Sequence, residues 1–140
     1  MPASTATPSP HGPGKPAAPT TILVVEDEVL IRLMISEYLR EFGYTVVEAR
    51  NAAEATRILR SDEPVQVVFS DVRMPGDMNG VGLAKWITHN RPEIGVVLTS
   101  AYVAQTDLPE QPEDLRNIVH KPYAPNEVLQ RIRAITGQMN

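Results

Sequence analysis

The sequence contains no cysteine and no long apolar run. Without cysteine the chain cannot form disulfides or bind a metal through thiolates. No apolar stretch approaches the roughly 20 residues that a membrane-spanning helix needs, and the N-terminal residues lack the apolar core of a secretion signal. We therefore expect a cytoplasmic protein with no membrane partner.

An excess of positive charge is also missing. Thirteen Lys and Arg residues face 17 Asp and Glu residues, which gives a formal net charge of −4. A surface that coats DNA or RNA would be basic, so we expect no nucleic-acid partner. With 140 residues the chain is long enough for one domain with a sizeable core.

Large apolar residues are absent from the first twenty positions after Met1. This segment instead holds six of the thirteen prolines, at Pro2, Pro8, Pro10, Pro13, Pro16 and Pro19. Such a composition cannot bury enough apolar surface to offset the entropy lost on ordering. We interpret residues 1–20 as a disordered Pro-rich tail, either without a role or used for docking, and residues 21–140 as the folded domain.

Short, mostly apolar runs recur along the rest of the chain. The strongest lie at residues 22–25, 65–69 and 96–98, and weaker ones at 46–47 and 118–119. Runs of this kind are typical of strands that are buried on both faces of a parallel sheet.

Two helical patterns lie between the first three runs. The first helix is predicted to end before Gly43 and to bury apolar residues at helical spacing, Ile31, Ile35, Tyr38 and Phe42. The second is predicted to begin at Asn51, which forms a capping box with Glu54, and to carry Ala55, Ile58 and Leu59.

Two more helices follow later in the chain. One is predicted over residues 81–87. The last should begin at Pro125, stop at Gly137 and bury Val128, Ile132 and Ile135. Residues 103–116 should be irregular or form one short turn, because two prolines interrupt any long helix there, Pro109 and Pro112.

Alternation of strands and helices predicts an α/β fold, a doubly wound five-stranded parallel sheet with helices on both faces. Ligand sites in such sheets lie outside the carboxyl ends of the strands. Here those ends carry polar residues, namely Glu26-Asp27-Glu28, Ser70-Asp71, Thr99-Ser100 and His120-Lys121-Pro122. We therefore expect carboxylates, a hydroxyl and an ammonium group to converge at one edge of the sheet.

Carboxylates that lie close together repel one another unless a cation neutralises them. A hard divalent ion such as Mg²⁺ suits this set of oxygen ligands. A carboxylate is also a plausible acceptor of a phosphoryl group. Lys121 is placed to pair with the phosphate, and Ser100 to donate a hydrogen bond to it.

Four segments at these strand ends closely resemble the receiver domain of two-component response regulators, the family of the chemotaxis protein CheY. They are residues 24–28 (VVEDE), 70–76 (SDVRMPG), 98–101 (LTSA) and 121–123 (KPY). The resemblance covers about residues 21–137. It implies a flavodoxin-like sheet with strand order 2-1-3-4-5.

The resemblance also implies a role for each acidic residue of the site. Asp71 would be the phosphoacceptor. Glu26 and Asp27 would hold Mg²⁺ together with Asp71, either directly or through water, and the backbone carbonyl of Arg73 would complete the metal site. Glu26 stands where the family commonly has aspartate, and its longer side chain would favour contact through water.

Two further residues acquire roles from the same resemblance. Ser100, rather than its neighbour Thr99, aligns with the switch hydroxyl that moves toward the phosphate. Lys121 would bind the phosphoryl group, and its peptide bond to Pro122 is expected to be cis.

The chain departs from the family pattern in several places. The loop over residues 75–80 is one residue longer than usual. Ile118 occupies the position of the aromatic switch residue, for which Tyr102 is a possible substitute. The fourth helix should be shortened or irregular, and we expect no output domain after the last helix.

These features predict a stand-alone, single-domain response regulator. It would accept a phosphoryl group from a histidine kinase or a histidine phosphotransfer protein and signal by binding an unknown protein target. It would catalyse only its own phosphorylation and dephosphorylation. The alternatives are a phosphorelay shuttle or phosphate sink, an unphosphorylated pseudo-receiver scaffold and, more remotely, a metal-dependent hydrolase.

Overall fold

The computed structural model describes residues 20–74, 76, 78–100 and 118–137. Five strands form one sheet, and every neighbouring pair is parallel. The strands are β2 (Thr21–Val25), β3 (Thr45–Ala49), β4 (Val67–Asp71), β5 (Gly95–Ser100) and β6 (Ile118–His120). Their order across the sheet is β3-β2-β4-β5-β6, which is 2-1-3-4-5 in chain order and confirms the predicted topology.

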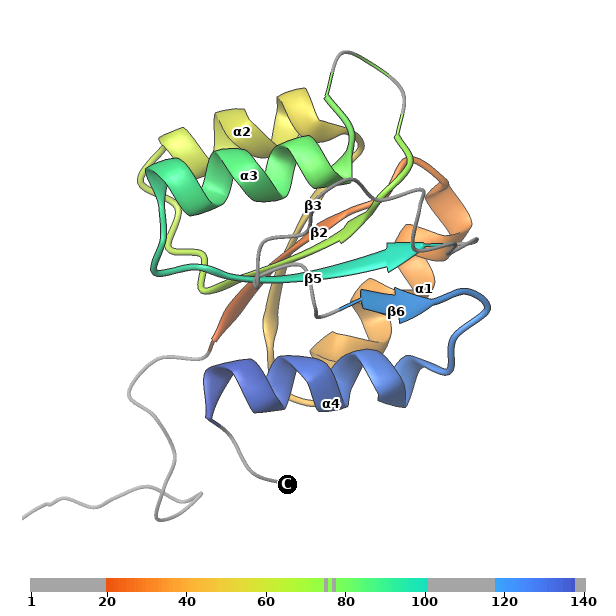
Figure 1. The fold of residues 1–140 in the computed structure, drawn as a ribbon. Coiled ribbons are helices and arrows are strands. Elements are labelled where there is room, and N and C mark those ends of the chain that lie inside the picture. The colour runs from red at the N-terminus through yellow and green to blue at the C-terminus, as the bar shows by residue number, and fades with distance from the viewer. Residues whose placement is uncertain (1–19, 75, 77, 101–117, 138–140) are drawn as a thin grey trace, which may run out of the picture.

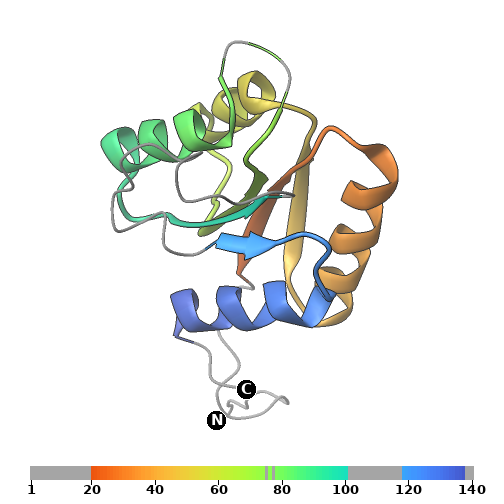
Figure 2. The same ribbon diagram turned by 45° about the vertical axis from the view of Figure 1, so that its right-hand side comes forward.

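Four helices within the described residues cover the two faces of this sheet. They are α1 (Val29–Glu41), α2 (Ala52–Arg60), α3 (Gly80–Asn90) and α4 (Pro125–Thr136). Helices α2 and α3 lie on one face, and α1 and α4 lie on the other (Figures 1 and 2). The predictions for residues 1–19 and 103–116 lie outside the described residues. None of the described helices is long and apolar enough to cross a membrane.

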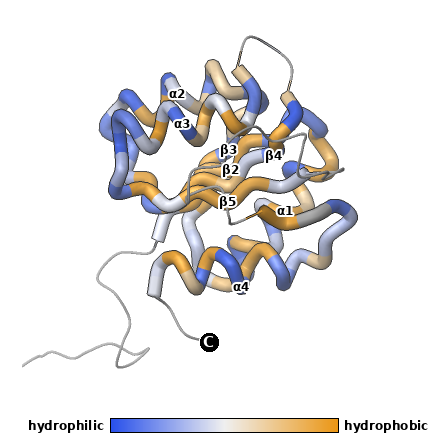
Figure 3. The backbone as a smooth tube through the Cα atoms, in the orientation of Figure 1, coloured by the Kyte–Doolittle hydropathy of each residue, from blue (hydrophilic) through white to orange (hydrophobic). Residues whose placement is uncertain are grey.

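The sheet separates two apolar cores. Strand side chains on one face of the sheet pack against α2 and α3, among them Leu23, Val25, Val68, Val96 and Leu98. Strand side chains on the other face pack against α1 and α4, among them Ile22, Val24, Val67, Phe69 and Val97. Apolar residues accordingly fill the central strands, while the helices alternate between apolar and polar faces (Figure 3). Burial on both faces explains why the strands are continuous apolar runs.

Helix ends follow the local sequence signals. Gly43 and Gly137 adopt positive φ angles of 95° and 78° and terminate α1 and α4, as predicted. The Asn51 side chain caps α2 by accepting a hydrogen bond from the Glu54 amide at 2.8 Å. The second half of the predicted capping box differs, because the Glu54 carboxylate accepts from the Arg50 amide, at 2.7 Å, in place of the Asn51 amide.

The predicted burial of some helix residues and the predicted start of one strand differ from the structure. Helix α1 ends before Gly43 as predicted, but Phe42 is its C-cap residue and is 46% exposed, so the predicted burial of Phe42 was wrong. Leu39 is buried on α1 instead, together with Ile35. In α4, Val128 and Ile132 are buried as predicted and Leu129 is buried as well, whereas Ile135 is only partly buried although it packs against the same core. Strand β4 begins at Val67, two residues after the apolar run starts.

Candidate functional site

The predicted site residues meet at the carboxyl edge of the sheet, toward which the arrows of β5 and β6 point in Figure 1. Glu26 follows β2 directly, Asp71 is the last residue of β4, and Ser100 is the last residue of β5. Lys121 follows β6. Because these strands are parallel neighbours, their ends lie side by side.

Lys121 joins two of the carboxylates. Its Nζ donates a hydrogen bond to Asp71 Oδ2 at 2.9 Å and lies 3.7 Å from Glu26 Oε1. The backbone amide of Lys121 donates to the carbonyl of Ser100 at 2.8 Å, which fixes the residue against the end of β5. The bond between Lys121 and Pro122 is cis, as the family resemblance led us to expect.

Three carboxylates form a cluster that suits a cation. One oxygen from each of Glu26, Asp27 and Asp71 lies within 4.8 Å of the other two. Glu26 is only 2% exposed, whereas Asp27 is exposed. Carboxylate oxygens at this spacing, with one side open to solvent, fit a hard divalent ion that keeps some of its waters.

Backbone amides orient two of these carboxylates. The Arg73 amide donates to Asp71 Oδ1 at 3.2 Å, and the Glu28 amide donates to Glu26 Oε2 at 3.1 Å. Arg73 therefore lies beside the phosphoacceptor candidate, as the sequence predicted. A metal-binding role for the Arg73 carbonyl stays a prediction.

The site holds its charges at an energetic cost. Burial raises the pKa of Glu26, and the nearby charges of Asp71 and Asp27 raise it further, against the Glu28 amide and Lys121. Burial alone would lower the pKa of Lys121, but the hydrogen bond and charge of Asp71, with the charges of Glu26 and Glu28, raise it overall. The site thus keeps its lysine charged while its buried glutamate resists ionisation.

Tyr123 packs beneath the site on the α1 and α4 side of the sheet. Its ring meets Phe69 edge to face, with the centroids 6.0 Å apart. The hydroxyl is buried and has no hydrogen-bond partner among the described residues. Burial, with the nearby charges of Glu26 and Asp71, raises the pKa of Tyr123 to about 12.

Ser100 and Thr99 are both buried, but their side chains lie on opposite faces of the sheet. Thr99 is paired with Asp71 in the strand register, whereas Ser100 lies one residue further along and is paired with His120. The alternation puts Ser100 on the side of Leu98 and α3. Ile118 is partly buried on that same side, and Tyr102, its predicted substitute, lies outside the described residues.

Two residues near the site were missed in the sequence. Arg32 donates to the backbone carbonyl of Glu26 at 2.7 Å and to the Glu48 carboxylate at 3.1 Å, so it ties α1 to the ends of β2 and β3. Gly80, the first residue of α3, lies against the backbone of Asp71. An isolated glycine in a helical pattern can have a packing reason, but the sequence does not say which segments meet there.

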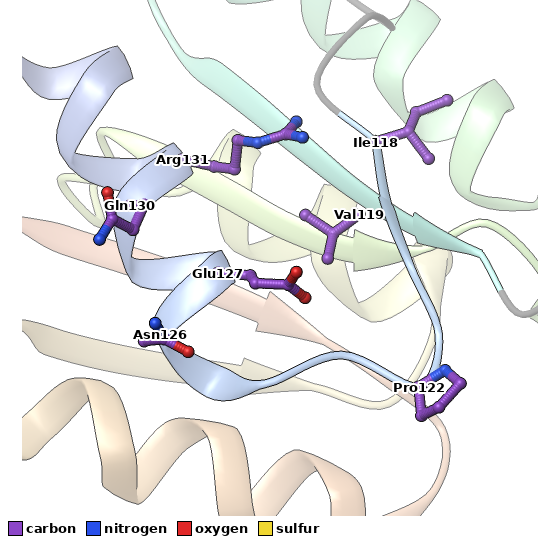
Figure 4. A pocket seen from close by; sticks show the side chains of 7 residues that line it. All are labelled: Ile118, Val119, Pro122, Asn126, Glu127, Gln130 and Arg131. Atoms are coloured by element: carbon purple, nitrogen blue, oxygen red, sulfur yellow. The ribbon is translucent and has the colours of Figure 1, made fainter.

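Two hollows flank the loop that follows β6. One of about 500 Å³ lies between β6 and α4, where Val119 points toward the helix and Ile118 points away (Figure 4). The other, of about 380 Å³, lies between α1 and the loop and is lined by Ile31, Met34, Lys121, Pro122 and Tyr123. The second hollow is the one that adjoins the carboxylate site, because Lys121 belongs to both.

Comparison with known proteins identifies the class to which this fold and site belong. The profile of the response regulator receiver domain matches residues 22–133. The chain therefore belongs to the response regulator receiver domain family. Receiver domains of this family are signalling domains that are phosphorylated on an aspartate, bind Mg²⁺ at an acidic pocket and interact with histidine kinases or phosphotransfer proteins.

Three relatives illustrate the similarity. The transcriptional regulatory protein PdtaR of Mycobacterium tuberculosis is 35% identical over 119 residues, which span 83% of this chain and 56% of PdtaR. Sporulation initiation phosphotransferase F of Bacillus subtilis is 27% identical over 80% of this chain and 90% of its own length. The response regulator TrrA of Thermotoga maritima, solved in complex with Mg²⁺-BeF, is 28% identical with a TM-score of 0.71, over 83% of this chain and 98% of that one. This chain thus spans little more than half of PdtaR but nearly all of the other two.

Proposed function

We propose that this protein is a phosphorylation-controlled switch in which Asp71 accepts a phosphoryl group from a phosphohistidine on a histidine kinase or phosphotransfer protein. The observation that carries the proposal is the pairing of Asp71 Oδ2 with Lys121 Nζ at 2.9 Å, inside a cluster of three carboxylates. This pairing gives one carboxylate a cationic partner that would also attract a phosphoryl group.

The transfer step is balanced by groups that the two proteins supply. An oxygen of the Asp71 carboxylate forms a bond to phosphorus while the bond between phosphorus and the donor imidazole nitrogen breaks. The imidazole keeps the electron pair and takes up a proton. Hydrolysis later reverses the state of the site, when water attacks phosphorus, inorganic phosphate leaves and the carboxylate is restored.

Glu26, Asp27 and Asp71 would hold Mg²⁺, with the backbone carbonyl of Arg73 as a further ligand. The spacing of their oxygens within 4.8 Å supports the three carboxylates as the core of the metal site. Bound Mg²⁺ would neutralise charge on the phosphoryl oxygens. Because Glu26 is buried, it would contact the ion from the side of the sheet. Because Asp27 is exposed, it would contact the ion from the solvent side.

Lys121 and Ser100 would read the phosphorylated state. Lys121 is already oriented toward Asp71, and its backbone is attached to the carbonyl of Ser100. A phosphoryl group on Asp71 would pull the ammonium group and the Ser100 hydroxyl toward its oxygens. The output is then a change in the affinity of the domain for a protein target.

Exposed apolar side chains beside the site support a protein as the phosphodonor. On α1, Leu30 is 80% exposed, Val29 55% and Met34 52%. Met34 also lines the hollow that contains Lys121 and Tyr123. An apolar surface next to the phosphoacceptor favours docking of a partner that delivers the phosphoryl group.

Amide spectra recorded with Mg²⁺ and beryllofluoride, a phosphoryl mimic, test the proposal. We expect shifts at Asp71 and Lys121 that require Mg²⁺, together with shifts on surfaces away from the metal site. Shifts confined to the metal site would contradict signalling through altered protein binding, and the absence of any shift would favour an unphosphorylated scaffold.

A phosphorelay shuttle is the second candidate. It is favoured by the similarity to a phosphotransferase that matches nearly end to end, the Bacillus protein described above. A shuttle must pass the phosphoryl group onward as fast as it receives it. Rapid transfer from phosphorylated protein to a histidine phosphotransfer protein would favour the shuttle, whereas no back-transfer would exclude it.

A further inference from the structure

Gly80 lies against the peptide backbone of the phosphoacceptor candidate. A Cβ atom built on Gly80 would overlap the carbonyl oxygen of Asp71 and would lie 2.8 Å from Val72 Cα and 2.9 Å from the Asp71 carbonyl carbon. These neighbours are backbone atoms, so no rotation of a side chain could make room. The first turn of α3 is therefore in direct contact with the end of β4.

Hydrogen bonds fix this contact from several sides. The Gly80 amide donates to the Val72 carbonyl at 2.8 Å, and the Val72 amide donates to the Thr99 carbonyl at 2.8 Å. The Ser70 hydroxyl donates to the Asp71 carbonyl at 3.0 Å. The segment that carries the phosphoacceptor is thus held between β5 and the start of α3.

The backbone conformation at position 80 does not explain why this residue is glycine. Gly80 is absent from the residues with positive φ, and it occupies the first position of a helix, where alanine has the better intrinsic propensity. What the position requires is space, because any side chain would collide with the Asp71 carbonyl. Asn79 caps the same helix by accepting a hydrogen bond from the Gly82 amide at 2.9 Å.

We infer that Gly80 is a positioning residue for the phosphoacceptor, an inference that rests on the proposed function of Asp71. By allowing α3 to touch the Asp71 backbone, Gly80 fixes where the carboxylate lies relative to Lys121 and Glu26. A side chain at position 80 would push the Asp71 peptide outward. The carboxylate would lose its 2.9 Å contact with Lys121 Nζ while the rest of the fold stayed in place.

Gly80→Ala tests the inference, with Gly82→Ala as the matched control. At Gly82 a Cβ would crowd only the flexible Met78 side chain, at 2.9 Å, and would lie at an ordinary contact distance of 3.6 Å from Asn79 Oδ1. The measurement is the rate of phosphoryl uptake from a small-molecule phosphodonor at saturating Mg²⁺, followed by intact-protein mass spectrometry. Misplacement of a reacting group by about 1 Å can cost on the order of 100-fold, so we expect Gly80→Ala to be about 10- to 100-fold slower. Gly82→Ala should stay within about twofold of wild type.

A second pair of variants separates positioning from general loss of stability. Asn79→Ala and Asn51→Ala each remove one side-chain cap, from α3 and α2, with similar hydrogen bonds of 2.9 and 2.8 Å. Both should lower the melting temperature by a similar amount, but only Asn79→Ala should slow uptake. A folded Gly80→Ala variant as fast as wild type would overturn the inference. If Gly80→Ala does not fold, equal rates for the two Asn variants would do so.

The chemical shifts of backbone amides provide a second readout that does not depend on phosphorylation. In metal-free protein, Gly80→Ala should shift the amides of Val72 and Arg73 more than Gly82→Ala does, because the Arg73 amide is bonded to Asp71 Oδ1. If wild type accepts no phosphoryl group, the proposed function fails, and these shifts alone decide the inference. Unchanged amides at both positions would then refute it.

Discussion

The environment of Glu26 disfavours the charged form of its carboxyl group. Glu26 is 2% exposed, and burial together with the charges of Asp71 and Asp27 raises its pKa. In the metal-free protein the folded state therefore holds the Glu26 proton more tightly than the unfolded chain does. The free energy of unfolding should fall as pH rises from the ordinary value of 4.5 through the raised folded-state pKa.

Glu26→Gln tests this reading, since glutamine keeps the acceptor but removes the charge. Without Mg²⁺ at pH 7 the variant should be more stable than wild type, and the difference should vanish below pH 4.5, where the carboxyl is protonated in both states. With Mg²⁺ the order should reverse, because we expect the variant to bind the metal roughly tenfold more weakly. Chemical denaturation at several pH values, with and without Mg²⁺, measures both effects. A variant that is less stable than wild type without metal would contradict the account.

Tyr123 carries a buried hydroxyl without a partner among the described residues. Tyr123→Phe removes that unsatisfied group, so we expect the free energy of unfolding at pH 7 to rise by about 1 kcal/mol. The folded-state pKa of about 12 exceeds the ordinary value of 10.0. Wild type should therefore lose stability between pH 10 and 12, as the unfolded chain ionises first.

The Tyr123→Phe variant should lack the part of the decrease in unfolding free energy at alkaline pH that comes from ionisation of the tyrosine. Lys121, whose pKa is also raised, contributes a loss in an overlapping range to both proteins, so the difference between them isolates the tyrosine. Denaturant titrations from pH 7 to 12 provide the comparison. Parallel stability curves for the two proteins would show that the hydroxyl is solvated in the folded state.

At the scale of elements, α4 packs on β5 through a glycine. A Cβ on Gly95 would overlap Ile135 Cγ2 and lie 3.5 Å from Ile135 Cβ. Because isoleucine is stiff at this branch point, Gly95→Ala should push α4 away from the sheet and cost about 2 kcal/mol of unfolding free energy. In an Ile135→Ala background the cost should be at least about 1 kcal/mol smaller. Equal costs in both backgrounds, measured by thermal or chemical unfolding, would exclude this contact as the cause.

Helix α1 presents the apolar surface that we assign to the phosphodonor protein. Leu30 is the most exposed of its large apolar side chains, at 80%. Leu30→Glu should slow transfer from a phosphorylated histidine kinase or phosphotransfer protein by about tenfold or more, as for a residue that matters in an interface. Transfer from a small-molecule donor should be unchanged, which serves as the internal control. Equal slowing with both donors would point to a damaged site, and no slowing with either would remove α1 from the docking surface.

At the scale of the whole molecule, the sequence predicts the sheet and the site edge well. Strands buried on both faces appear as apolar runs in the sequence. Because parallel strands end at one edge of the sheet, the polar residues at their ends predict where the site lies. Glu26, Asp71 and Lys121 could be found in this way. The caps formed by Asn51, Gly43 and Gly137 are equally local.

Features that depend on packing between distant segments could not be found in the same way. The Arg32 contact with the Glu26 carbonyl and the Gly80 contact with Asp71 arise only once the helices are placed on the sheet. The exposed position of Phe42 depends on where α1 ends, which helical spacing alone leaves open by a residue or two. The roles assigned to the site residues remain predictions, namely those of Glu26, Asp27, Asp71, Ser100, Lys121 and the Arg73 carbonyl.

The proposed switch requires that Asp71 accepts one phosphoryl group and needs Mg²⁺ to do so. Intact-protein mass spectrometry after incubation with a small-molecule phosphodonor tests it most directly, on wild type and Asp71→Asn, with Mg²⁺ and with a chelator. We predict a single phosphoryl adduct on wild type that disappears with the chelator and in the variant. An adduct that persists in Asp71→Asn, or one that forms equally well without Mg²⁺, would contradict the account.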